Sequence, residues 1–133
     1  MRERNFIVSI KTVDDKALFP SNFNGEVFLM MLTTQVSAKT GIALKGFASF
    51  PTGVEFILYC KDVQEARSYA DDVANNIYLK TNSLCHVIYS FGIYVSELTD
   101  DEKTLEAVMM DMMTRSMAAR GFDMGSVTDM CVS

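Results

Sequence analysis

The chain has 133 residues, enough for one domain with its own core. Its hydrophobic content of 49% and charged content of 22% exclude an intrinsically disordered chain. The net charge of −5 arises in the last third, because residues 1–95 hold nine basic and nine acidic side chains, whereas residues 96–133 hold three and eight. Nucleic-acid binding depends on Lys and Arg contacts with phosphates, so this balance argues against a strong binder and leaves only a local basic face open.

Signals for export and membrane insertion are not found in the sequence. No apolar stretch approaches the ~20 residues that span a bilayer. Residues 1–4 lead into a strand-like segment without the apolar core of a signal peptide. We therefore expect a cytoplasmic protein. Cys60, Cys85 and Cys131 form no C-x-x-C pair, and we expect reduced thiols, the first two in apolar strands.

The first half of the chain predicts a strand, a helix and a hairpin. Alternation over residues 5–11 predicts a strand. A helix is expected from Asn24 to about Lys39, with Gly41 as its stop. The apolar runs 42–49 and 54–60, joined by a short Pro-Thr-Gly turn, predict an antiparallel hairpin. Within the helix, four side chains repeat at helical spacing: Val27, Met31, Thr34 and Ala38.

The second half predicts a helix, a strand and a final helix. Asp62 is expected to cap the first of these, which should fray over residues 75–82. The run Leu84–Val95 predicts a strand, with Gly92 as a bend or bulge. A capping box at residues 99–102 begins the last helix, which should end near residues 120–121. The helix that Asp62 is expected to cap has an apolar stripe that consists of Val63, Ala66, Ala70, Val73 and Ile77.

The order of elements, β-α-β-β-α-β-α, predicts an α+β fold. A ferredoxin-like β-α-β-β-α-β arrangement, with four antiparallel strands backed by two helices, satisfies this order, and the third helix is an addition at the C-terminal end. We expect residues 1–123 to form a single domain and residues 124–133 to form a tail without a clear period.

Three local patterns point to a known family. Residues 15–20 read Asp-Lys-Ala-Leu-Phe-Pro, like the family's loop after the first strand. Residues 46–58 fall on its pattern of strand, Met-Pro-Asn-His-x-His and strand, and residues 115–122 are similar to its closing Asn-Pro-x-Arg-Ala-Gly-Leu. These patterns follow one another in the same order as in the family. Over residues 4–123 the chain therefore resembles the REP-associated tyrosine transposases of the HUH single-strand transposase superfamily.

The resemblance implies a chemistry for which this chain lacks the residues. In the family, two histidines on a strand and a polar side chain on the terminal helix bind a divalent metal, and a tyrosine on that helix attacks DNA. Here the histidine positions are Gly53 and Glu55, and the one histidine is His86. Glu55 would not make a metal site on its own. No tyrosine occurs in residues 99–133. We therefore expect no catalytic residue, no metal, no cofactor and no strand cleavage by the family mechanism.

His86 follows Cys85 in the expected strand, where adjacent side chains point to opposite faces. The pair therefore cannot form a thiolate–imidazolium dyad by itself, and a structural histidine is the favoured interpretation.

Four basic residues are candidates for nucleic-acid contacts: Lys45, Lys80, Arg115 and Arg120. A groove beside residues 53–55 that is lined by any of them would favour structured single-stranded DNA or RNA as the ligand. An apolar methionine-lined surface there would favour a protein partner instead.

Methionines concentrate at the C-terminal end, where seven of the ten lie in the last 25 residues. Met109, Met112 and Met113 continue the apolar stripe of the last helix, whereas Met110 and Met117 fall towards other faces. Because large apolar side chains are rarely left bare, Met110, Met113 and Met117 are candidates for a dimer interface, Met113 being counted in both groups. Dimerisation through the terminal helix is also what the resemblance implies.

The sequence therefore favours a catalytically inactive, transposase-derived domain that acts by binding, as a homodimer. Its ligand is either structured single-stranded nucleic acid or a protein. The alternative is a ferredoxin-like protein-interaction or small-ligand module unrelated to transposases, and a third hypothesis is an enzyme with rearranged chemistry.

Overall fold

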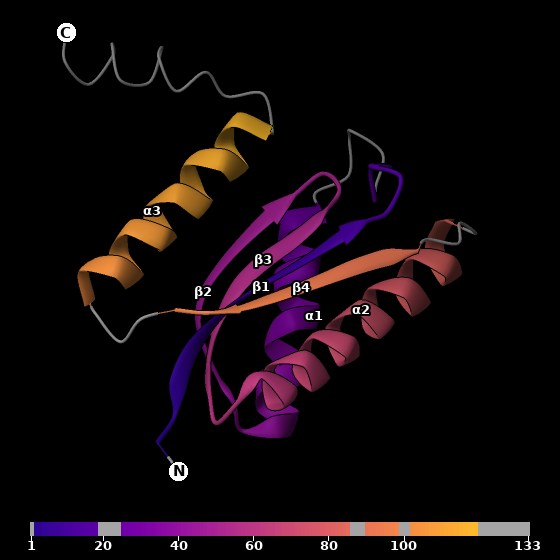
Figure 1. Cartoon of the computed structure of the whole chain (residues 1–133). Helices are drawn as coiled ribbons and strands as arrows, with labels where there is room; N and C mark the ends of the chain where they lie inside the picture. Colours follow the sequence, from indigo (N-terminus) through magenta and orange to yellow (C-terminus); the bar gives the residue numbers. More distant parts are fainter. Residues whose placement is uncertain (1, 19–24, 86–89, 99–101, 120–133) are drawn as a thin grey trace, which may run out of the picture.

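The computed structural model describes residues 2–18, 25–85, 90–98 and 102–119. Its elements follow the expected order (Figure 1). They are β1 (Arg4–Thr12), α1 (Gly25–Thr40), β2 (Ala43–Phe50), β3 (Gly53–Cys60), α2 (Val63–Cys85), β4 (Phe91–Glu97) and α3 (Glu102–Ala119). None of the helices in these ranges is long and apolar enough to cross a lipid bilayer.

The four strands form one antiparallel sheet with the order β2-β3-β1-β4. The hairpin β2–β3 turns at Pro51 and Thr52, and β1 lies between β3 and β4. This is the ferredoxin-like arrangement, so the predicted α+β fold is confirmed. Alternation in β1 is confirmed as well, since Phe6, Val8 and Ile10 are fully buried and Ile7 lies on the opposite face.

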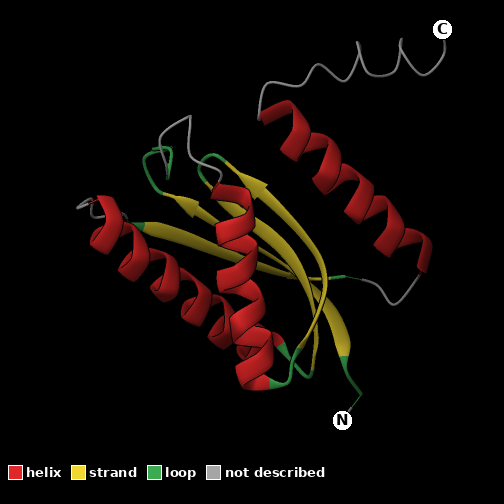
Figure 2. Cartoon of the chain, turned by 180° about the vertical axis from the view of Figure 1, so that it is seen from behind, coloured by secondary structure: helices red, strands yellow, loops and turns green. Residues whose placement is uncertain are grey.

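Helices α1 and α2 cover one face of the sheet and enclose the main core (Figure 2). The core joins β1 and β3 to both helices, and Tyr69 of α2 connects the two helices to each other. Its buried hydroxyl donates to the Thr33 carbonyl of α1 at 2.8 Å and lies 2.7 Å from the Ser37 hydroxyl. A buried phenol without such partners would be costly, so these bonds fix the position of α1 against α2.

Helix α3 lies on the opposite face of the sheet, over β2, in a smaller second core (Figure 1). Met112 of α3 is buried against Ala48 of β2 and Ile57 of β3. The other half of this face, on β1 and β4, is left more open, and Tyr94 of β4 is 66% exposed there. The sheet therefore has one fully covered face and one half-covered face.

The ends of the helices agree in part with expectation. Asp62 caps α2, since its Oδ1 accepts from the Glu65 amide at 2.8 Å. Gly41 stops α1 with φ 78°, a conformation that glycine adopts without penalty. In the predicted stripe of α2, Val63 is 46% exposed, whereas the remaining members, Ala66, Ala70, Val73 and Ile77, are buried.

The predicted strand over residues 84–95 is wrong at its beginning. Leu84 and Cys85 end α2, and β4 begins only at Phe91. The fraying expected over residues 75–82 does not occur, because the buried stripe continues through Thr81, whose hydroxyl donates to the Ile77 carbonyl at 2.8 Å. Cys85 is thus helical rather than in a strand. Cys60 does end β3 and is buried, as expected.

The predicted irregularity at Gly92 is also wrong. Gly92 pairs with Lys11 in an unbroken register between β1 and β4. The sheet's register shift lies in β2 instead, between Leu44 and Gly46. Lys45 at this shift lies 5.3 Å from the centre of the Tyr59 ring, as a cation–π contact.

The buried face of α1 differs from the stripe seen in the sequence. Leu29, Leu32, Thr33 and Val36 are buried. Val27 and Met31, by contrast, are 65% and 44% exposed. This helix is apolar around most of its circumference, so spacing alone could not identify the side that packs against the sheet.

The Cys60 thiol makes the stability of this fold depend on pH. Burial, followed by the charge of Glu65, raises the pKa of Cys60 from 9.0 to about 11. The stabilisation from the neutral thiol is complete below pH 9 and is lost as the pH rises towards 11, because only the unfolded chain ionises easily there. Between pH 8 and pH 10.5 we expect the free energy of unfolding to fall in both proteins. The fall should be about 2 kcal/mol larger in the natural protein than in Cys60→Ala. Urea denaturation at the two pH values measures this difference, and equal losses in both proteins would contradict it.

Candidate functional site

Gly53 begins β3 at a point where the backbones of neighbouring strands come close. It pairs with Lys11 of β1 and with Phe50 of β2. A Cβ at this position would collide with the Ile10 carbonyl oxygen and would lie 2.9 Å from the carbonyl carbon. The first histidine position of the resembled family therefore has no room for a side chain in this backbone.

Glu55, at the second histidine position, points towards α3 from the middle of β3. It is flanked across the sheet by the small residues Ser9 and Ala48, and its side chain is only 5% exposed. Both carboxylate oxygens accept from Arg115 of α3, at 2.6 Å and 2.7 Å. This two-point geometry matches the fork of a guanidinium to a carboxylate, and it joins residues that are 60 positions apart in the sequence.

Two further charges complete the cluster. Lys11 Nζ lies 3.6 Å from Glu55 Oε2, and Arg115 Nε donates to Asp111 Oδ2 at 2.8 Å. Lys11 and Arg115 both lie over the Phe50 ring, 5.5 Å and 5.6 Å from its centre. We call Lys11, Glu55, Asp111 and Arg115 the charge cluster; its two positive and two negative side chains balance each other.

One more polar contact connects α3 to the sheet beside the charge cluster. The Ser116 hydroxyl, which is buried, donates to the Ser49 carbonyl of β2 at 2.5 Å. Because Arg115 and Ser116 are consecutive, the last turns of α3 are attached to both β2 and β3. The position of the helix over the sheet is therefore fixed by polar bonds as well as by Met112.

The charge cluster is suited to structure rather than to proton transfer or metal binding. The hydrogen bond to Glu55 raises the pKa of Arg115 above its usual range, so this cation stays charged at every physiological pH. Its guanidinium already bonds both carboxylate oxygens of Glu55. Within the described ranges, no three His, Cys, Asp or Glu side chains are grouped as metal ligands.

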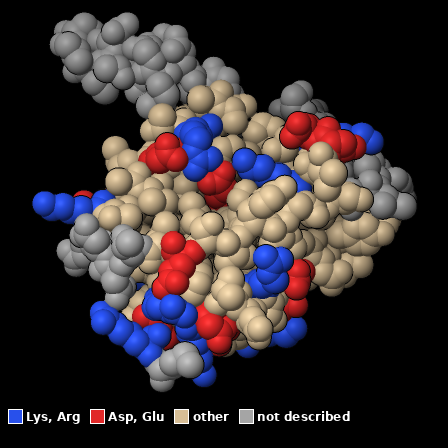
Figure 3. Space-filling model, viewed as in Figure 1, with Lys and Arg blue, Asp and Glu red and all other residues tan. Residues whose placement is uncertain are grey.

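Three of the four predicted nucleic-acid contacts lie in the part of the chain that the structure describes, and they are not grouped together. Arg115 is bound in the charge cluster, and Lys45 lies on β2 over Tyr59. Lys80 is on α2, which packs against the opposite face of the sheet, and Arg120 lies outside the described residues. Figure 3 shows basic and acidic side chains intermingled on the α3 side, without a continuous basic patch.

The methionines of α3 divide between core and surface. Met112 is buried and Met109 packs partly buried against the second core, as expected. Met110 and Met113 are 65% and 56% exposed, so the core position expected for Met113 is wrong, and its role at an interface stays a prediction. Met117 is half-buried, beside the turn that carries Arg115.

The remaining sequence candidates contribute little to the site. His86 and Tyr89 lie outside the described residues, as does Cys131. Tyr78 belongs to α2, and Tyr94 lies on the open half of the sheet, in register with Ser9. The residues that sequence reasoning missed are Lys11 and Asp111. The available signal was Glu55 itself, since a carboxylate inside the apolar run of β3 requires a cation from elsewhere in the fold.

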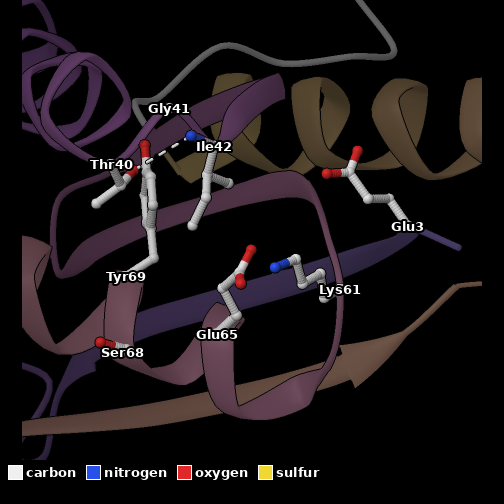
Figure 4. A pocket seen from close by; sticks show the side chains of 8 residues that line it. All are labelled: Glu3, Thr40, Gly41, Ile42, Lys61, Glu65, Ser68 and Tyr69. Carbon is white, nitrogen blue, oxygen red and sulfur yellow. Dashed lines mark hydrogen bonds between the residues drawn. The ribbon is translucent and has the colours of Figure 1, made fainter. Parts of the chain in front are cut away.

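A shallow depression of about 470 Å³ lies at the other end of the molecule (Figure 4). Its walls come from the end of α1 and the start of α2, and Figure 4 places Lys61 between Glu3 and Glu65. Tyr69 also lines it, but the Tyr69 hydroxyl is already bonded to α1. This depression is separate from the charge cluster.

No protein-family model matches the chain, and no curated protein is significantly similar to it. The solved structures that share its fold include two transposase-type proteins. One is a REP-associated tyrosine transposase bound to a REP hairpin, with a TM-score of 0.56 and 9% identity over 81% of this chain. The other, a protein from Deinococcus radiodurans R1 assigned as a transposase, has a TM-score of 0.55 and 12% identity over 84% of this chain and 89% of its own.

The chain spans 64% of the length of the hairpin-bound transposase. At identities of 9% and 12% the likeness is one of fold. The predicted transposase-like fold is thus confirmed.

Removing the Arg115 side chain should destabilise the protein, because it leaves the buried Glu55 carboxylate with Lys11 alone. We expect Arg115→Ala to lower the free energy of unfolding by about 2–3 kcal/mol. The double variant with Glu55→Gln and Arg115→Ala should lose clearly less free energy of unfolding than the sum of the losses in the two single variants. Urea denaturation of the four proteins measures this coupling, and strictly additive effects would show that the pair contributes nothing.

The crowding at Gly53 can be tested with a matched glycine. We expect Gly53→Ala to cost about 2 kcal/mol or more, because the β1 and β3 backbones must move apart. Gly46→Ala is the control, since a Cβ there would make only ordinary contacts with Met109 and Ile57, at 3.4 Å and 3.5 Å. Thermal unfolding followed by circular dichroism compares the two variants. Equal melting temperatures would contradict the crowding.

Proposed function

We propose that this chain is a catalytically inactive, transposase-derived domain that acts by binding, as a homodimer. The observation that carries the proposal is the pair between Glu55 and Arg115. It lies between the sheet and the terminal helix, where the resemblance implies that the transposases hold their metal. Gly53 offers no ligand there, and α3 carries no tyrosine that would attack DNA.

The ligand that the surface supports best is a protein. The charge cluster is neutral, and the four candidate cations are dispersed, bound or outside the described residues. By contrast, Met110 and Met113 give the outer side of α3 two large exposed apolar side chains. Methionine is common on surfaces that adapt to protein partners because its side chain is flexible and polarisable.

Structured single-stranded nucleic acid is the second candidate. The specific observation in its favour is the likeness to a transposase that was solved with a REP hairpin. The open half of the sheet also exposes Tyr94 next to Ser9, and an aromatic side chain on a sheet offers a surface on which an unpaired base stacks.

A ferredoxin-like interaction or small-ligand module without a transposase history is the remaining alternative. The low sequence identities and the depression between Glu3 and Tyr69 are the observations in its favour. A small ligand bound at that depression would leave the charge cluster untouched.

The proposal predicts that labelled hairpin DNA is not cleaved in the presence of Mg²⁺ or Mn²⁺, because neither a histidine pair nor a terminal tyrosine is available. Product analysis on denaturing gels tests this. Tyr94→Phe and Tyr78→Phe are the controls: cleavage that disappears in either variant would overturn the proposed inactivity.

Binding of the same hairpins, and of unstructured strands, separates the two ligands. If the ligand is a protein, we expect no hairpin preference and little binding at any salt concentration. Hairpin-selective binding that weakens steeply with salt would establish the nucleic-acid candidate in its place.

A further inference from the structure

The outer side of α1 carries an apolar stripe that the fold does not use. Val27, Met30 and Met31 are 65%, 45% and 44% exposed. Thr34, Gln35 and Ala38 are exposed on the same side of the helix, at the spacing of successive turns. We call these six residues the α1 stripe. In Figure 2, α1 lies in front of the sheet, and the six residues are exposed whereas Leu29, Leu32, Thr33 and Val36 of the same helix are buried.

The α1 stripe contains no charge. Between Glu26 in the first turn and Lys39 in the last, α1 has twelve residues without a charged side chain. The outer side of α3 is different, because the exposed residues Lys103, Glu106 and Asp111 accompany its methionines. An uncharged helix surface with several large apolar side chains is characteristic of an interface.

The α1 stripe is complementary to a second copy of itself. When two α1 helices lie antiparallel with Glu26 of one level with Lys39 of the other, paired positions sum to 65. That register places Met31 opposite Thr34, Met30 opposite Gln35 and Val27 opposite Ala38. Each large side chain then meets a smaller or more adaptable one, and this favours close packing.

The charges at the ends of α1 support the same antiparallel register. The acidic first turn of one helix comes level with the basic last turn of the other, at both ends of the pair. The helix dipoles then also run in opposite directions. A parallel arrangement would instead bring like charges and like dipole ends together.

We propose that two copies of this chain associate through the α1 stripe, about a two-fold axis that passes between residues 32 and 33. The inference rests on the proposed homodimer but moves its interface from α3 to α1. Such an interface is isologous, with the same residues contributed by each copy. It leaves α3 and the open half of the sheet accessible for a separate ligand.

The experiment compares molecular masses at micromolar concentration, by light scattering after size exclusion. The variants are Met31→Glu and Thr34→Lys, which place a charge inside the α1 stripe, and Met110→Glu as the matched control on α3. We expect a dimer for the natural protein and for Met110→Glu, and a monomer for each α1 variant. An equimolar mixture of the two α1 variants should recover the dimer, because the carboxylate introduced at position 31 of one chain then faces the ammonium group introduced at position 34 of the other. Circular dichroism verifies that the monomers are folded.

Each other outcome overturns the inference in a recognisable way. Dimeric α1 variants, or a monomeric Met110→Glu, would place the interface elsewhere while preserving the homodimer. Folded monomeric variants that do not recover the dimer on mixing would reject the register. A monomeric natural protein would reject both the α1 interface and the homodimer. The cleavage test on hairpin DNA is independent of all these results.

Discussion

The bidentate pair between Glu55 and Arg115 is the interaction on which the second layer of this structure depends. A carboxylate in the middle of β3, flanked by Ser9 and Ala48, is shielded from water by α3, and without a cation its charge would be costly. Arg115 supplies that cation and in doing so positions the last turns of α3. Ser116 and Met112 then complete the packing beside it. Together these contacts hold α3 over β2 and β3, and the half of this face on β1 and β4 stays more open.

The same pair accounts for the relation between fold and function. A likeness to transposases at 9% and 12% identity concerns the backbone, and backbones of this type serve many activities. What distinguishes this chain is the content of the site between β3 and α3. A self-contained ion pair, with Asp111 and Lys11 balancing it, uses the site to hold the helix in place.

Sequence patterns predicted the parts of the structure that depend on neighbouring residues. Alternation in β1, the Pro51–Thr52 turn, the Asp62 cap and the Gly41 stop all involve residues close together in the chain, and all are confirmed. The run after residue 83 was misread because short apolar stretches satisfy helix and strand equally well. The sequence indicates Arg115 as a candidate for a nucleic-acid contact, whereas in the structure it pairs with Glu55, 60 positions away. Pairings of that kind depend on how the elements pack against one another. The periodicity of a sequence carries no information about that packing.

The close approach of β1 and β3 at Gly53 has a consequence for how this protein can change. A histidine at position 55 alone would take one substitution, although it would also leave Arg115 without its partner. A histidine at position 53 would need a different path for two strands, because the obstacle is the Ile10 carbonyl and not a neighbouring side chain. A histidine pair of the family type would therefore require a backbone rearrangement at the hairpin end of β3, where Gly53 lies. Each of the two substitutions, Glu55→His and Gly53→His, would by itself give a less stable fold.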